Sequence, residues 1–524
     1  MLDSQECMRE LFAAAENSGI STLFRNPCNR RDFLKQSALM VFSAGLAGCA
    51  GEQHIGDARG SGLPNIVYIL ADDLGYGDVS CLNEDSRLHT SRIDSLAAAG
   101  MRFTDAHSGS AVCTPTRYGI LTGRYAWRSR LKKGVLGGYS PHLIEEGRTT
   151  CASLLKRRGY HCACIGKWHL GWDWAKSGSR ESDVDFTKPV THGPRSNGFD
   201  YSFCIPASAD IGPYVYVEND MPTALPTEKI ERSKGKQLMW EGVKAPDLQP
   251  EELLSRFTRK AVSYINVRAK DNGTPFFLYF PMTAPHTPIL PAKEFLGKSG
   301  TNEYGDFVLQ VDDCVGQVLD ALERGGLSRN TLVFFTSDNG CAPMADFDEL
   351  AEFGHDPSYV FRGAKADIYE GGHRIPFIAR WPGVVRRGEV SGDTICLTDL
   401  LRTLADITGE KLAPDEGEDS VSIMPALTGK VGRPLREAIV HHSNNGSFSI
   451  RQGKWKLELC AGSGGWSSPR PGSDAEAALP PVQLYDLSKD ISEQINLQDK
   501  HPDVVRRLSA LLQQYKDSGR SVPL

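Results

Sequence analysis

The chain has 524 residues, of which 40% are hydrophobic and 24% are charged, as in ordinary folded globular proteins. This length accommodates one large α/β domain and a smaller appendage. The formal net charge of −6 argues against a general polyanion-binding surface, so no nucleic-acid partner is expected. An anionic substrate would need a local cluster of basic residues.

The first 49 residues have the pattern of a bacterial export signal. The pair Arg30-Arg31 precedes an apolar run that ends at Leu46, as in twin-arginine signals, and this run is well short of the ~20 apolar residues that span a bilayer. The run closes with Leu-Ala-Gly-Cys49, which resembles a lipobox and makes Cys49 a candidate lipid anchor. Residues 50–63 are polar and Gly-rich, which is typical of a flexible tether. We therefore expect the twin-arginine export machinery as a partner, and a location in the periplasm or on the outer membrane.

Residues 64–432 alternate between apolar strands and amphipathic helices. Continuous apolar or β-branched runs predict buried strands, at 65–70, 101–103, 160–165, 276–280, 331–335 and 375–381. Helical periodicity and capping residues predict helices, at 91–99, 151–158, 308–322 and 397–407. This alternation predicts an α/β fold in which helices flank a large sheet.

After residue 432 the pattern changes. Short strand-like pieces with Gly and Pro between them are found at 437–442, 448–451, 455–460 and 482–485. A terminal amphipathic helix is predicted for residues 502–516. We expect residues 433–524 to form a smaller antiparallel-sheet subdomain that packs on the first domain.

Polar motifs follow the ends of the predicted strands, and two of them carry oxygen donors. Asp72 and Asp73 end the first strand, and Asp338 and Asn339 follow another. Because the carboxyl ends of parallel strands meet at one edge of a sheet, these side chains should converge. Such a set suits a hard divalent cation, with Ca²⁺ favoured where many protein oxygens are available. Either pair alone would more often be a helix cap or a turn.

The segment Cys113-Thr114-Pro115-Thr116-Arg117 is a candidate reactive site. It opens a short apolar helix that is predicted to end at Gly123, so Cys113 lies at a helix N-terminus, which favours negative charge. The cation at Arg117 would also favour an anionic nucleophile. The five residues alone are equally typical of an ordinary buried cysteine, and the partners elsewhere in the chain decide between the two interpretations.

Several basic residues also follow predicted strands. A single Lys or His is usually solvated or structurally satisfied, so each signal is weak alone. Their repeated placement fits a cage for a tetrahedral anion, and the candidates are Arg117, Lys167, His169, His286 and Lys365.

The motif Cys-x-Pro-x-Arg followed by Leu121-Thr122-Gly123-Arg124 resembles the signature of the type I sulfatases, and the resemblance continues from Asn65 to the C-terminus. It is closest to sulfatases similar to N-acetylgalactosamine-6-sulfatase and arylsulfatase A. The resemblance implies an alkaline-phosphatase-like fold with a catalytic domain over 64–432. It also implies that a maturation enzyme oxidises Cys113 to Cα-formylglycine. Calcium would then be bound by position 113 together with Asp72, Asp73, Asp338 and Asn339.

The resemblance also implies a mechanism for sulfate ester hydrolysis. The aldehyde hydrates to a gem-diol, and one hydroxyl attacks sulfur while Lys167 and Arg117 neutralise the sulfate oxygens. His286 or Lys365 protonates the leaving sugar oxygen, and the sequence leaves the choice between them open. His169 deprotonates the second hydroxyl, so that sulfate is expelled.

Candidates for substrate binding come from two stretches that also resemble these sulfatases. They are Asp210 and Tyr214, and His442 and Trp466, whose polar and aromatic groups suit a sugar ring. Each alone is equally consistent with packing. The implied substrate is a sulfated carbohydrate, such as 6-O-sulfated N-acetylgalactosamine or galactose at a chain end. Two alternatives stay open, which are a phosphonate or phosphate ester hydrolase with the same site, and a glycan-binding lipoprotein whose Cys113 is never converted.

Overall fold

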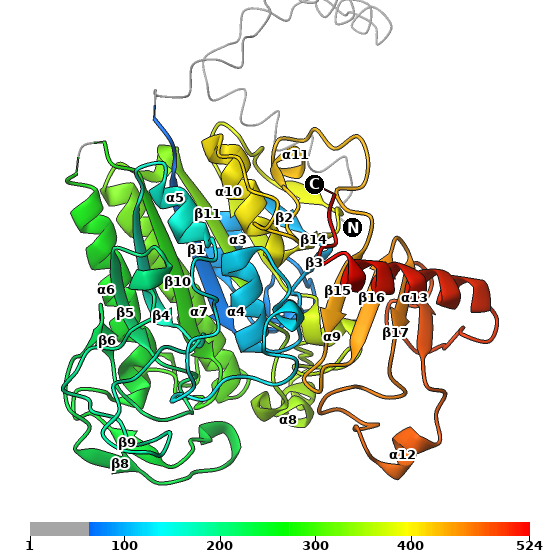
Figure 1. The fold of residues 1–524 in the computed structure, drawn as a ribbon, viewed down its shortest axis with the longest axis horizontal. Helices are drawn as coiled ribbons and strands as arrows, with labels where there is room; N and C mark the ends of the chain where they lie inside the picture. Colours follow the sequence, from blue (N-terminus) through cyan, green and yellow to red (C-terminus); the bar gives the residue numbers. More distant parts are fainter. Residues whose placement is uncertain (1–61, 272, 524) are drawn as a thin grey trace, which may run out of the picture. The chain divides into compact units, whose positions relative to one another are not determined.

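A ten-stranded mixed sheet runs through the described part of this computed structural model, residues 62–271 and 273–523 (Figure 1). From one edge to the other its strands are β13 (Glu389–Ser391), β2 (Met101–Phe103), β12 (Phe377–Arg380), β11 (Thr331–Ser337), β1 (Asn65–Asp72), β10 (Phe276–Pro285), β4 (His161–Lys167), β5 (Tyr201–Ile205), β6 (Val217–Glu218) and β7 (Met221–Pro222). The five strands from β11 to β5 are mutually parallel, so their carboxyl ends share one edge.

Side-chain alternation along the central strand divides the core into two layers. Every residue of β1 is buried, and Ile66, Tyr68 and Leu70 face one hydrophobic cluster while Val67 and Ile69 face the other. Because strand side chains alternate between faces, an uninterrupted apolar run requires cover on both sides. Helices supply that cover. The first cluster includes residues of α4 (Cys113–Thr122), α5 (Cys151–Lys156) and α10 (Leu400–Thr408), and the second those of α3 (Ser91–Ala98), α6 (Leu253–Arg268) and α7 (Glu303–Arg324).

A separate antiparallel sheet forms the C-terminal part. Its strands follow chain order, β15 (Ile439–His442), β16 (Phe448–Gln452), β17 (Trp455–Glu458) and β18 (Gln483–Asp486), and α13 (Pro502–Asp517) packs on β16 and β17. The predicted fold class, a large mixed sheet flanked by helices with a smaller antiparallel C-terminal sheet, is therefore confirmed. The boundary placed between residues 432 and 433 stays a prediction.

Smaller elements complete the described chain. Two-stranded pairs are formed by β3 (Ala106–His107) with β14 (Ile395–Cys396) and by β8 (Glu228–Ile230) with β9 (Gly242–Lys244), and the short helices are α8 (Phe347–Glu352), α9 (Glu370–His373), α11 (Met424–Leu427) and α12 (Asp474–Ala477). The expected signal, with Arg30, Arg31 and Cys49, lies outside the described residues, as does most of the expected tether. No helix of the described residues is both long and apolar enough to cross a membrane.

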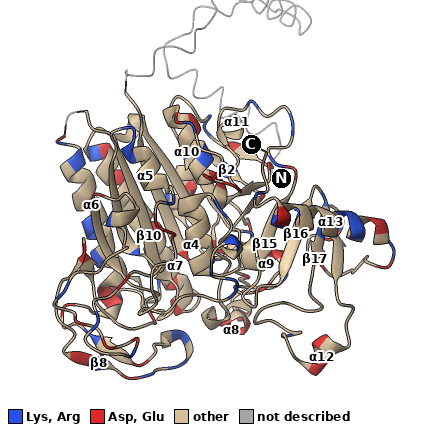
Figure 2. Cartoon of the chain, viewed as in Figure 1, with Lys and Arg blue, Asp and Glu red and all other residues tan. Residues whose placement is uncertain are grey.

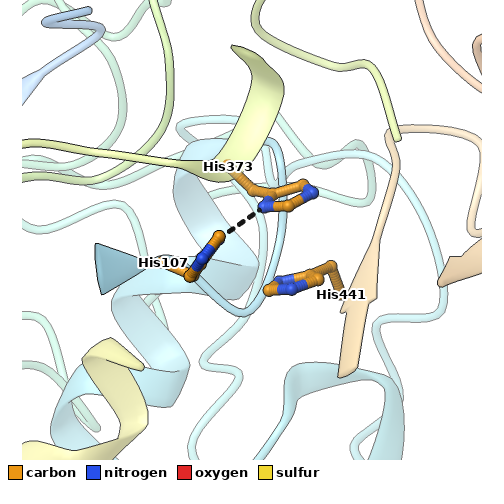
Figure 3. Close-up of side chains that lie close together, drawn as sticks. All are labelled: His107, His373 and His441. Carbon is orange, nitrogen blue, oxygen red and sulfur yellow. Dashed lines mark hydrogen bonds between the residues drawn. The ribbon is translucent and has the colours of Figure 1, made fainter. Parts of the chain in front are cut away.

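Three buried histidines join the large sheet region to the C-terminal sheet (Figure 3). They are His107 on β3, His373 on α9 and His441 on β15, and the rings of His373 and His441 are stacked with centroids 3.8 Å apart and planes within 9°. An imidazole binds a metal through a lone pair in its ring plane, so two parallel stacked rings cannot share one ion in this arrangement. The Lys456 ammonium also lies 3.1 Å from His373 Nε2. This cluster is therefore a packing and hydrogen-bonding contact between the two parts.

Candidate active site

Cys113 is the first residue of α4 and is buried. The helix ends where Gly123 adopts the left-handed conformation, with a φ of 64°, as the sequence predicts. The loop before Cys113 is fastened to β15, because the His442 carbonyl accepts hydrogen bonds from Ala111 N at 3.0 Å and Ser110 Oγ at 3.1 Å. The C-terminal sheet thus borders the candidate nucleophile directly.

The ionisation state of Cys113 depends on the balance between burial and nearby cations. Burial raises the pKa of the Cys113 thiol, although the ammonium groups of Lys167 and Lys365 act in the opposite direction. Neighbouring cations thus favour an anionic thiol, as expected, but desolvation outweighs their charge. As a cysteine, the residue is a neutral thiol rather than a ready nucleophile.

The four oxygen donors among the predicted metal ligands meet at the carboxyl ends of β1 and β11. Asp73 N donates to Asp338 Oδ1 at 3.2 Å, and Asn339 Nδ2 donates to Asp73 Oδ1 at 2.8 Å. Asp73 holds a φ of 65°, a left-handed conformation that is uncommon outside glycine and that turns the chain sharply after Asp72. Sheet topology has thus brought together residues more than 260 positions apart in sequence, as expected from the strand-end pattern.

Three cations are interleaved with these carboxylates. Lys167 Nζ lies 2.7 Å from Asp72 Oδ2, Arg117 Nη2 lies 2.7 Å from Asp338 Oδ2, and Lys365 Nζ lies 2.7 Å from Asp73 Oδ2. All of these side chains are buried, so each charge depends on its partner. Burial alone would raise the pKa of Asp72, but Lys167, His286 and Arg117 outweigh it and hold that pKa well below its usual range.

The oxygen donors fit a divalent cation. Asn339 Oδ1 is buried and has no hydrogen-bond partner among the described residues, which leaves a hard ligand atom unused. One ligand atom each from Asp72, Asp73 and His286 lies within 4.8 Å of the others. Burial raises the pKa of Asp338, to which the charges of Asp72 and Asp73 add, and a cation among these carboxylates would relieve their repulsion. The donor set is therefore suited to a hard divalent cation.

The two predicted histidines differ in which ring nitrogen is hydrogen-bonded to the backbone. His169 Nε2 donates to the Leu136 carbonyl at 2.8 Å, which leaves Nδ1 as the lone-pair nitrogen, and Nδ1 is buried without a partner among the described residues. Burial and the nearby Lys167 lower the pKa of His169 well below its usual value. His286 Nδ1 donates to the Thr287 carbonyl at 2.7 Å, so its Nε2 faces the site, 3.5 Å from Asp73 Oδ2.

Ser208 joins these groups, and the sequence reasoning missed it. Its hydroxyl lies 2.9 Å from Lys167 Nζ and 3.1 Å from His286 Nε2, and the side chain is buried. It lies in the loop that follows β5, the next parallel strand of the sheet. The strand-end pattern that identified the other residues could have found it, had β5 been recognised as a strand.

The predicted substrate-binding residues lie near the carboxylates and cations described above. Asp210 Oδ1 is 4.0 Å from His286 Nδ1 and has no hydrogen-bond partner among the described residues. The Tyr214 hydroxyl donates to the Asp210 carbonyl at 2.8 Å, so it supports this loop and is not free for a ligand. His442 is buried on β15, and its Nδ1 has no partner within the described chain. The Trp466 ring centroid lies 5.9 Å from Lys365 Nζ.

A buried site of this composition, at the carboxyl edge of a doubly covered sheet, defines a hydrolase that acts on an anionic ester. The Sulfatase family model matches residues 64–410. An N-acetylgalactosamine-6-O-sulfatase of Bacteroides thetaiotaomicron is 36% identical over 515 aligned residues, which cover 90% of this chain and 96% of that protein. An N-acetylgalactosamine-6-sulfatase of Rattus norvegicus is 30% identical, covering 87% of this chain and 86% of that protein.

Solved structures agree with this match. One structure, described under the metabolism of multiple glycosaminoglycans by Bacteroides thetaiotaomicron, superimposes with a TM-score of 0.76 at 34% identity, over 87% of this chain and 99% of that one. A sulfatase from Pseudoalteromonas sp. has a TM-score of 0.66 at 22% identity, over 94% of this chain and 95% of that one, and shares the fold. The chain belongs to the sulfatase family and has the alkaline-phosphatase-like fold of these relatives. It is a sulfuric ester hydrolase.

Proposed function

We propose that this sulfatase removes 6-O-sulfate groups from N-acetylgalactosamine or galactose in a sulfated glycan, through a Cα-formylglycine made from Cys113 and with a bound Ca²⁺. The observation that carries the proposal is the burial of Cys113 at a helix N-terminus within the ring of alternating carboxylates and cations. The names of the most similar relatives support the sugar and the sulfate position.

The residues of the site fit both a bound Ca²⁺ and a formylglycine at position 113. Asp72, Asp73, Asp338 and Asn339 would hold Ca²⁺. When bound, Ca²⁺ supplies positive charge that polarises a sulfate oxygen, and formylglycine supplies a carbonyl carbon that can present a hydroxyl to sulfur. The raised pKa of the Cys113 thiol supports the need for conversion, because an unmodified neutral thiol is a poor nucleophile here.

Different residues of the chain would neutralise charge and transfer protons. Lys167 and Arg117 are buried and held by ion pairs with carboxylates, so they would neutralise the sulfate oxygens without reorganising. The pKa of Lys365 is raised, since Asp73 outweighs the effect of burial, which suits a fixed charge better than a proton donor. His286 Nε2 would therefore protonate the leaving sugar oxygen. His169 Nδ1, with its lone pair free, would act as the base that resets position 113.

We also propose that the protein is exported by the twin-arginine machinery and anchored through Cys49, after a formylglycine-generating enzyme has modified Cys113. The Arg30-Arg31 pair and the lipobox-like sequence support this proposal. Cell fractionation of the native host tests it. Arg30→Lys with Arg31→Lys should retain the protein in the cytoplasm, and Cys49→Ala should release it from the membrane fraction.

Two measurements test the catalytic proposal. Mass spectrometry of the peptide that contains position 113, from the native host, should find the aldehyde, and a peptide found only as the thiol would overturn the proposed nucleophile. Sulfate release should then be measured on 6-O- and 4-O-sulfated N-acetylgalactosamine and 6-O-sulfated galactose, with matched phosphate esters in parallel and Cys113→Ala as the inactive control. Faster release from the 4-O-sulfated sugar would overturn the sugar assignment, and preferred phosphate hydrolysis would favour the phosphoesterase alternative.

Removal of the cation gives an independent test with a readout besides activity. Treatment with EGTA should lower the thermal unfolding temperature, because three buried carboxylates lose their common ligand, and Ca²⁺ should restore it better than Mg²⁺. An unfolding temperature that is the same with and without EGTA and added Ca²⁺ would contradict the proposed metal site.

A further inference from the structure

The loop between β8 and β9 lies against two loops of the active site. Trp240 N donates to the Asp210 carbonyl at 2.9 Å, and Ile289 N donates to the Lys236 carbonyl at 2.8 Å. Asp210 approaches His286 to 4.0 Å, so both contacts are made with the loops that surround the proposed proton donor. Figure 1 shows the β8–β9 pair at the end of the sheet where β1 and β10 end. This loop therefore forms part of the rim on the leaving-group side.

Trp240 is unusual among the aromatic side chains of this rim. It is 43% exposed, and no other tryptophan of the described residues is exposed to this degree. The Arg232 guanidinium lies over its ring, 4.2 Å from the centroid. A flat apolar surface beside a cation is the combination that binds an acidic sugar, since the ring covers the C–H face of a pyranose and the guanidinium pairs with an acid group.

The charge of this loop is opposite to that of the whole chain. Residues 231–241 contain three basic and two acidic side chains, whereas the chain carries a net charge of −6. Lys236 is bound to Glu303 and Glu349, but no ion pair of the described residues includes Arg232 or Lys234, and both are exposed. Figure 2 shows the blue segments of this loop beside β8. Two basic groups are thus available to an anionic partner at the rim.

We propose that Trp240 and Arg232 form a subsite for the sugar on the leaving-group side of the sulfated residue, and that this second sugar carries a carboxylate or a further sulfate. The inference rests on the proposed function, because a second sugar would lie beside Trp240 and Arg232 only if His286 faces the leaving sugar oxygen. Trp240 stacks on the second sugar, and Arg232 pairs with its acid group. The substrate is then an acidic oligosaccharide rather than a single sulfated sugar.

Steady-state kinetics on matched substrates test the subsite. The substrates are a 6-O-sulfated monosaccharide and disaccharides in which the second sugar is neutral, carboxylated or sulfated. Trp240→Ala should lower kcat/KM on every disaccharide about tenfold more than on the monosaccharide, as expected for the loss of one stacking contact. Arg232→Ala should lower it about tenfold on the acidic disaccharides and far less on the neutral one. Val390→Ala and Arg386→Ala, which alter exposed residues at β13 or just before it on the opposite edge of the sheet, should change none of these ratios.

Binding to an inactive variant separates this inference from the proposed function. In Cys113→Ala, calorimetric titration with the same disaccharides should show weaker binding on addition of Trp240→Ala or Arg232→Ala, whether or not the wild type releases sulfate from them. If the variants lower the unfolding temperature while every substrate ratio and affinity stays at the wild-type value, the Arg232–Trp240 pair only stabilises the loop and the subsite is overturned. Equal losses on monosaccharide and disaccharide would overturn it as well.

Discussion

His169 shows how burial can fix both the charge and the tautomer of one side chain. Its Nε2 hydrogen is used by the Leu136 carbonyl, and burial with the adjacent Lys167 lowers its pKa well below 6.5. A base that is already deprotonated should keep working as the pH falls through 6.5. We predict that His169→Ala lowers kcat by about 10²- to 10⁴-fold, the usual contribution of a general base.

The pH profile of kcat provides the check on His169. The wild type should show no loss of activity with a midpoint near 6.5 that is attributable to this residue, and the exposed His89→Ala should behave as the wild type does. A variant at position 169 that retains wild-type kcat would remove this imidazole from the mechanism.

Ser208 acts through its neighbours rather than on the substrate. A hydrogen bond to a charged group contributes about 1.5–3 kcal/mol, and the Ser208 hydroxyl lies within bonding distance of both Lys167 Nζ and His286 Nε2. Ser208→Ala should therefore lower kcat by roughly tenfold or more with a smaller change in KM, because orientation is lost but the charges remain. Ser208→Thr keeps a hydroxyl and should recover part of the loss. A KM effect alone, without a kcat effect, would contradict the positioning role.

The strand β4, which lies between β10 and β5, positions Lys167 through a close approach that only glycine permits. Gly166 has a φ of 134°, and a Cβ at this position would lie 1.9 Å from the Pro281 carbonyl oxygen of β10. Gly166→Ala must displace one strand against the other, so we predict a loss of unfolding free energy of more than about 2 kcal/mol and a large loss of activity. Gly159→Ala is the matched control, because its φ is 78° but no atom lies within 4 Å of the added Cβ. That variant should cost about 1 kcal/mol in urea unfolding and retain its activity.

The length and composition of each strand decide which parts of the fold and the site could be predicted from the sequence. The apolar runs of β1, β10 and β11 are long, so the end of each strand can be located in the sequence. The polar residues that follow these strands converge because the strands are parallel. By contrast, β5 is short and has no such run before the loop that carries Ser208, and the β8–β9 loop that carries Trp240 is mostly polar. Ser208 and Trp240 are placed at the site by hydrogen bonds between loops, and such bonds leave no repeating pattern in the sequence. The neutral thiol of Cys113 also required the structure, because burial could not be read from its neighbours in sequence.

At the scale of the whole molecule, the site is closed by parts of the chain that are far apart in sequence. The Ala366 amide donates to the Ala111 carbonyl at 2.8 Å, and Asn444 N donates to the Ala366 carbonyl at 2.9 Å. Lys365, the loop before Cys113 and the C-terminal sheet are therefore linked by consecutive main-chain hydrogen bonds. Loosening of the C-terminal sheet should move both Lys365 and Cys113, so stability of this contact and catalytic activity are coupled.

Buried histidines make the contact between the C-terminal sheet and the rest of the molecule sensitive to acid. Burial lowers the pKa of His442 to about 4, and it also lowers the pKa values of His107, His373 and His441. In the unfolded chain a histidine titrates near 6.5, so the unfolded state binds protons first as the pH falls. The stability contributed by neutral His442 is thus complete above pH 6.5 and is lost on the way down to pH 4. At pH 5 the loss amounts to about 2 kcal/mol for this residue.

Urea unfolding at pH 7.5 and pH 5 measures this loss. His442→Gln cannot take up the proton, so we predict that its unfolding free energy falls by about 2 kcal/mol less than that of the wild type over the same interval. The comparison must be made between variant and wild type, because burial raises the pKa of Glu493 and this group titrates with the opposite sign. The exposed His89→Ala should show the wild-type slope. Equal slopes for His442→Gln and the wild type would mean that position 442 already takes up its proton in the folded protein, and acid would then weaken the contact through other groups.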